Sequence, residues 1–208
     1  MGTEDAAELI AELKEQRSEH EQGERFNRVA ALLIATMAAA LAIGGLGGGN
    51  ATDDMVLNTI RASDTWAFYQ AKNVRQTMYE LELADLEDRL PQAGTNRAAH
   101  EARIAEARAT IARYDDEPDA DAPNDPMRGE GKKQLKAQAQ MFEANRDVAV
   151  AQDNNFDLAE VALQLALVLG SVAILATNRT ILIASSVLGG IGALLTLNGF
   201  LLLLALPF

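Results

Sequence analysis

Aromatic, amide and basic side chains crowd one stretch of the chain, from residue 66 to residue 75. Aromatic and arginine side chains are favoured anchors of protein interfaces, so this stretch predicts an interaction belt that clamps a partner helix, a lipid head group or a second subunit. The alternative is that the belt packs against a returning helix around Phe142 and Arg146. The belt comprises Trp66, Phe68, Tyr69, Gln70, Lys72 and Arg75.

Three further polar residues, Asp157, Glu160 and Asn198, lie within or beside long apolar runs. Ionisable groups at membrane depth are candidate proton relays or ion ligands. In the first turn of a membrane helix a carboxylate also favours the helix dipole and reaches interfacial water, which gives Asp157 and Glu160 a purely structural alternative. We expect Asn198 to form a hydrogen bond between helices rather than to bind a substrate.

The polar residues are not spaced as a catalytic or metal-binding set. The chain has no Cys and only His20 and His100, which excludes disulfides, thiol chemistry, Cys-ligated zinc and an all-histidine metal site. Ser and Thr are scattered, and no glycine-rich phosphate loop follows a strand-like run. The acidic run at 115–125 does not match the EF-hand pattern. We therefore expect neither enzymatic activity nor a bound metal or cofactor.

Charge and apolarity are segregated along the sequence. The net charge is −12, from 18 Lys and Arg against 30 Asp and Glu, which argues against nucleic acid as a partner. Residues 29–46 are uncharged and would form about 27 Å of helix, against a hydrocarbon core of about 30 Å. A short polar break joins two more apolar runs, 161–176 and 180–208, which predict spans at 156–176 and 180–206. We predict three transmembrane helices in a lipid bilayer, because these runs leave no polar face for water.

The basic residues near these spans predict their orientation. Residues 1–28 read as a long acidic helix, unlike the short basic start of a signal peptide, so we expect an uncleaved anchor. A modest excess of basic residues places the N-terminus in the cytoplasm and residues 51–155 on the opposite face. The cytoplasmic set is Lys14, Arg17, Arg25, Arg28 and Arg179, and the opposite set is Arg61, Lys136 and Arg146.

Residues 51–155 are expected to form a helical stalk, either a hairpin or a coiled coil. Between residues 51 and 90 there is no Gly or Pro, and apolar residues recur seven apart as in a coiled-coil seam. Pro91 and Gly94 predict a turn before a second helix at 97–114. A mobile acidic loop at 115–131 then precedes a helix that continues into the second span. The seam comprises Leu57, Ile60, Ala67, Ala71, Val74, Met78 and Leu81.

The predicted fold class is therefore all-α, with three transmembrane helices and the stalk inserted between the first and second. The seam is too narrow and Ala-rich to close a monomeric core, so we predict a homo-oligomer. The alternative is a monomeric three-helix bundle closed by the helix at 97–114. Small residues four apart predict close helix packing in each span. They are Ala31, Ala35 and Ala39, then Ala162, Ala166 and Gly170, and last Ser185, Gly189 and Ala193.

The segment SDTWAFYQAKNVRQTMYEL, residues 63–81, follows a first span that ends in LGGGNA. With the Leu- and Gly-rich last span, it resembles an uncharacterised bacterial membrane-protein family catalogued as domain of unknown function 4337. The resemblance covers nearly the whole chain and implies the same order of acidic helix, span, variable charged region and closing pair of spans. It carries over no activity and no catalytic residue.

These patterns favour a non-catalytic integral protein of the bacterial inner membrane, which self-associates or serves as a structural or accessory subunit of an envelope complex. The alternative is an oligomeric channel or transporter-like pore, lined by Asp157, Glu160 and Asn198. Flux across liposomes distinguishes the two.

Overall fold

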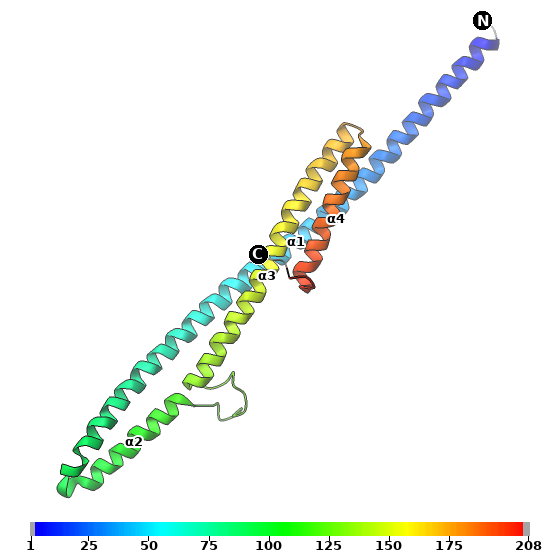
Figure 1. Cartoon of the computed structure of the whole chain (residues 1–208). Helices are drawn as coiled ribbons and strands as arrows, with labels where there is room; N and C mark the ends of the chain where they lie inside the picture. The colour runs from blue at the N-terminus through cyan, green and yellow to red at the C-terminus, as the bar shows by residue number, and fades with distance from the viewer. Residues whose placement is uncertain (1–2, 206–208) are drawn as a thin grey trace. The chain divides into compact units, whose positions relative to one another are not determined.

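The computed structural model describes residues 3–205, apart from the side chains of residues 3–12, 15, 18 and 19. The described chain is built from α1 (Thr3–Arg89), α2 (Arg97–Asp115), α3 (Lys132–Leu175) and α4 (Arg179–Leu201), with 3-10 turns at Leu90–Gln92 and Gly94–Asn96 (Figure 1). The prediction of an all-α fold is confirmed. Three of these helices are long and apolar enough to cross a membrane.

The helices divide into two compact units. Unit 1 comprises residues 1–52 and 149–208, and unit 2 comprises residues 53–148. Both α1 and α3 contribute to each unit.

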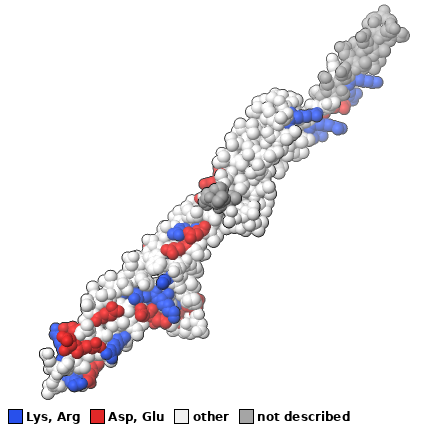
Figure 2. Space-filling model, in the orientation of Figure 1, with Lys and Arg blue, Asp and Glu red and all other residues white. Residues whose placement is uncertain are grey.

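In unit 1, α1, α3 and α4 run side by side and pack through small residues (Figure 1). Ala30 of α1, Ala173 of α3 and Leu182 of α4 form one buried cluster. Met37, Leu163 and Ala166 form a second cluster along the same helices. Figure 2 shows the surface over these helices as almost free of charge, with Lys and Arg gathered at one end. Apolar helices with an apolar exterior are typical of a membrane-spanning bundle.

The glycine-rich stretch at residues 44–49 does not end a helix, because α1 continues through it. The end of the first membrane span at residue 46 stays a prediction. Gly47 and Gly48 face Phe156 of α3. A Cβ on Gly47 would lie 2.6 Å from the Phe156 ring, so these glycines allow α1 and α3 to approach closely. The glycines therefore serve helix packing rather than termination.

The tight turn between α3 and α4 is closed by Asn178, whose side chain accepts hydrogen bonds from the backbone N–H groups of Thr180 and Ile181 at 2.9 and 3.3 Å. This is an ordinary helix N-cap.

At its other end α4 stops at Leu201, earlier than the predicted span, which reached residue 206. Leu202 has a φ of 46°, and its backbone N–H donates to the Asn198 carbonyl. Residue 206 lies outside the described residues.

In unit 2, α1 packs along α2 and the first part of α3 (Figure 1). Ile104 and Ala107 of α2 are buried. Arg103 and Arg108 of α2 bind Glu82 and Glu87 of α1 at 2.7 and 2.6 Å. The ring of Tyr79 in α1 lies 5.8 Å from that of Tyr114 in α2.

Candidate functional site

The coiled-coil seam predicted on α1 points outward in unit 2. Ile60, Val74 and Leu81 are 52%, 55% and 68% exposed. The hairpin is closed by a different face of α1, where Ala62, Lys72, Gln76 and Leu86 are buried. The residues spaced seven apart therefore share one face of α1, but this face does not pack within the chain. We refer to Leu57, Ile60, Ala67, Ala71, Val74, Met78 and Leu81 together as the α1 seam.

The predicted interaction belt divides between the two faces of α1. The Trp66 indole N–H donates to Glu143 Oε1 of α3 at 2.8 Å, and the Tyr69 ring lies 5.5 Å from the Trp66 ring at a steep angle. For Trp66 the structure thus favours the alternative of packing against the returning helix. Phe68, Gln70 and Arg75 are exposed. They flank the α1 seam and stay candidates for contact with a partner.

Lys72 is the buried cation of unit 2, with its side chain only 5% exposed. Its ammonium binds Glu117 Oε2 at 2.8 Å and donates to the backbone carbonyl of Glu130. The rings of Phe68 and Tyr114 each lie 5.6 Å from the same nitrogen. A buried charge needs partners of this kind because desolvation disfavours its charged form. Lys72 therefore ties both ends of the acidic segment 115–131 to α1.

The segment 115–131 follows a defined path in the structure, and its predicted mobility stays a prediction. Pro118 and Gly129 form an isolated antiparallel bridge. Gly129 has a φ of 112°, a conformation that favours glycine. Hydrogen bonds from Gln134 and Lys133 to Asp116 lower the pKa of that carboxyl.

A line of exposed residues on α3 alternates polar and apolar side chains in unit 1. Spacings of four and three residues place its members on one narrow face of the helix. Glu160 lies beside the line and accepts a hydrogen bond from Gln164 at 2.8 Å. Gln164 is seven residues, about 10 Å, further along the apolar part of α3 than Asp157. We call this set the α3 polar line: Asp157, Val161, Gln164, Val168, Ser171 and Leu175, all exposed.

Asn198 of α4 faces inward, unlike Asp157 and Glu160. Its Nδ2 donates to Asn155 Oδ1 of α3 at 2.7 Å, and its Oδ1 accepts from the Leu204 backbone N–H at 2.8 Å. Both asparagines are buried. Asn198 therefore links α3 and α4 and also holds the chain that follows α4, whereas Asp157 and Glu160 are exposed on α3.

The small-residue stripes have different environments in the three helices. In α3, Ala162, Ala166 and Gly170 are buried, and in α4 Ser185 and Gly189 are buried while Ala193 is partly so. The Ser185 hydroxyl donates to the Ala166 carbonyl at 2.7 Å. In α1, by contrast, Ala31, Ala35 and Ala39 are exposed. The α1 face that packs within the chain carries Ala30, Met37 and Gly44 instead.

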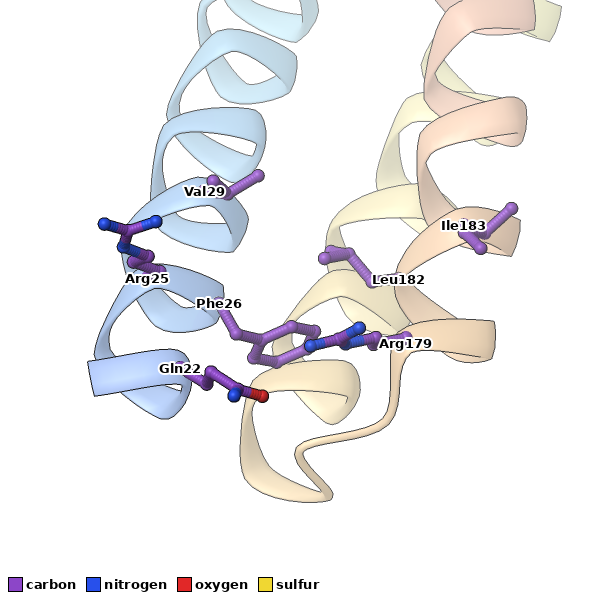
Figure 3. Close-up of a pocket in the computed structure, with 7 residues that line it drawn as sticks. All are labelled: Gln22, Arg25, Phe26, Val29, Arg179, Leu182 and Ile183. Carbon is purple, nitrogen blue, oxygen red and sulfur yellow. The ribbon is translucent and has the colours of Figure 1, made fainter. Parts of the chain in front are cut away.

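A groove of about 360 Å³ lies between α1 and the start of α4, at the basic end of unit 1 (Figure 3). Phe26 and Gln22 of α1 point toward Arg179 of α4, whereas the Arg25 guanidinium points away from Arg179, on the far side of α1. Val29, Leu182 and Ile183 complete the lining. From the sequence alone, Arg25 and Arg179 are predicted only to lie at the cytoplasmic ends of the spans. Two features of the sequence could have indicated the groove. Both arginines flank apolar runs, and the tight turn before Arg179 places it at the start of α4.

Within the part of the chain whose side chains are described, no three His, Asp or Glu residues gather as a metal site. A family model described as "Domain of unknown function (DUF4337)" matches residues 26–202. No curated protein and no solved structure matches the chain.

Proposed function

The chain belongs to the DUF4337 family, and we propose that it is an integral membrane protein that self-associates and serves a structural or accessory role in a membrane complex. Unit 1 would cross the bilayer with parts of α1, α3 and α4, and unit 2 would stand outside it. The bacterial inner membrane, with the N-terminus in the cytoplasm, is the location that the basic residues and the family resemblance favour.

The α3 polar line carries the proposal of self-association. In a lone chain, Gln164 and Ser171 would face lipid from an otherwise apolar helix. Gln164 donates to Glu160 and the Ser171 hydroxyl donates to the Leu167 carbonyl within α3, but their remaining hydrogen-bonding capacity would find no water there. A second copy of α3 with the same seven-residue spacing would cover them. Carboxamide and hydroxyl groups both donate and accept, so two identical lines meeting across a two-fold axis can bond to one another.

The α1 seam supports the same proposal from unit 2. Its apolar residues lie outside the chain's own packing, and their heptad spacing suits another helix with the same repeat. Phe68, Gln70 and Arg75 flank the seam at positions where coiled coils set the choice of partner. Asp64 interrupts the seam, and one polar residue at such a position is a known device for fixing register.

Cysteine cross-linking tests self-association, because the chain has no native Cys. Val168→Cys lies on the α3 polar line, and Leu169→Cys is a matched control, since both residues are exposed. The two positions differ by about 1.5 Å in depth and about 100° around the helix. In oxidised membranes we expect a disulfide-linked dimer from Val168→Cys and little from Leu169→Cys. Equal yields, or no dimer from either, would refute an interface at this line.

A pore is the second candidate, favoured by the outward carboxylates of Asp157 and Glu160. Several copies would have to surround a channel so that these groups line water rather than lipid. Liposomes containing the purified protein would then pass ions faster than empty ones, and Glu160→Gln would change the rate. Flux equal to that of empty liposomes would remove this candidate.

A further inference from the structure

We propose that the groove between α1 and α4 binds an anionic phospholipid, with the phosphate held at Arg179 and an acyl chain lying on the apolar wall. The inference rests on the proposed membrane location and goes beyond it by naming a ligand. The groove volume of about 360 Å³ falls in the usual range of about 300–1,000 Å³ for small-molecule sites.

The charged end of the groove offers the Arg179 guanidinium to a phosphate. Among the described residues, no carboxylate forms an ion pair with Arg179. The nearby acidic residues of α1 lie beside other side chains at the surface: Glu21 Oε1 is 3.4 Å from Arg17 Nε, and Glu24 Oε1 is 3.5 Å from His20 Nε2. A guanidinium matches phosphate geometry with two parallel hydrogen bonds. The Gln22 amide, which points to the same side, can donate another (Figure 3).

The apolar wall continues from the charged end along the two helices. Val29 and Ile183 are 53% and 64% exposed, on opposite sides of the groove. Leu182 belongs to the buried cluster with Ala30 and Ala173, and Phe26 packs against that cluster. A site with a cation at one end and aliphatic side chains beyond it suits an amphiphile better than a free anion. Basic pockets between membrane helices are established binding places for anionic head groups.

The test uses the full chain purified in dodecyl maltoside, with binding followed by native mass spectrometry. Dioleoyl phosphatidylglycerol, dioleoyl phosphatidylcholine and inorganic phosphate are titrated separately. We expect phosphatidylglycerol to bind most tightly and Arg179→Gln to weaken it by about 10-fold or more, the usual range for a charged hydrogen bond. Arg28→Gln is the matched control, because Arg28 is exposed near the same end of α1 and does not line the groove.

Arg179→Gln should leave the α3–α4 turn folded, because a positive charge in the first turn of a helix opposes the helix dipole and the variant retains the Asn178 cap. Arg179→Lys provides a second variant, which should recover part of the lost affinity because it keeps the charge without the planar fork.

Several outcomes would overturn the inference. Phosphatidylcholine binding as tightly as phosphatidylglycerol, or Arg28→Gln weakening binding as much as Arg179→Gln, would mean that no specific site exists. Inorganic phosphate binding as tightly as the lipid would assign the groove to a free anion. A chain found outside the membrane fraction would refute the proposed function instead, whereas a membrane-embedded chain without lipid preference would refute only this site.

Discussion

Alanine at Gly47 should destabilise unit 1, because Phe156 fills the space that a methyl group would need. The added Cβ would lie 2.6 Å from Phe156 Cζ and 2.9 Å from Phe200 Cζ. Phe156 cannot easily move aside, since it is 3% exposed and its ring packs edge-on against Phe200 with centroids 4.9 Å apart. A Cβ on Gly199 would meet the same ring at 2.6 Å. The Phe156 ring therefore fills the space beside a glycine of α1 and beside a glycine of α4.

Gly49→Ala is the matched control, because nothing lies within 4 Å of its added Cβ. Both substitutions gain about 1 kcal/mol of helix propensity. Overpacking costs about 1–3 kcal/mol, so Gly47→Ala should be about 1–3 kcal/mol less stable than Gly49→Ala. Phe156→Leu shortens the obstructing side chain, and in the double variant with Gly47→Ala it should recover about 1 kcal/mol or more beyond additivity.

The assay is reversible unfolding of the purified protein in mild detergent micelles by added sodium dodecyl sulfate, followed by circular dichroism. The free energies of unfolding of the four variants complete the comparison. Equal stability of Gly47→Ala and Gly49→Ala, or strict additivity with Phe156→Leu, would refute the close approach of α1 and α3 at this level.

Three other predictions follow from single contacts. Lys72→Met should release the 115–131 segment and speed tryptic cleavage after Arg128. Lys136→Met is the control, because Lys136 is exposed, and it should leave the cleavage rate unchanged. Equal cleavage rates of the two variants would contradict the anchoring role of Lys72. Asn198→Leu should lower the free energy of unfolding by about 1–2 kcal/mol, and Asn155→Leu should add little to that loss, because the two share one hydrogen bond. Ala122→Cys should react with an impermeant thiol reagent in intact cells, and labelling only after lysis would reverse the proposed topology.

Helix positions could be predicted from local signals. Pro91 and Gly94 stop α1 and form the turn, and Gly94 has the positive φ of 50° that such a turn favours. The end of the acidic, Pro-rich segment similarly marks the start of α3 at Lys132. These signals act over a few residues, so they need no knowledge of the tertiary contacts. The glycine-rich stretch carries no such local signal, because glycine also permits close packing, which here depends on the distant Phe156.

The buried face of α1 in unit 2 could not be predicted from hydrophobicity. The α1 seam is the more apolar face, yet the hairpin buries Lys72 and Gln76. The reason is that residues 117 and 130, far along the chain, supply the partners of the Lys72 ammonium. A buried lysine becomes acceptable only when such partners are present, and their positions are set by the path of the segment 115–131. The same holds for Trp66, whose partner Glu143 lies 77 residues away.

The mass of the wild-type protein in lipid nanodiscs tests self-association most directly. Light scattering with the lipid contribution subtracted gives the protein mass in each particle. Self-association through the α3 polar line and the α1 seam predicts a whole-number multiple, two or more, of the 22.3 kDa chain. A single 22.3 kDa chain per particle, at protein-to-lipid ratios that allow several, would contradict it.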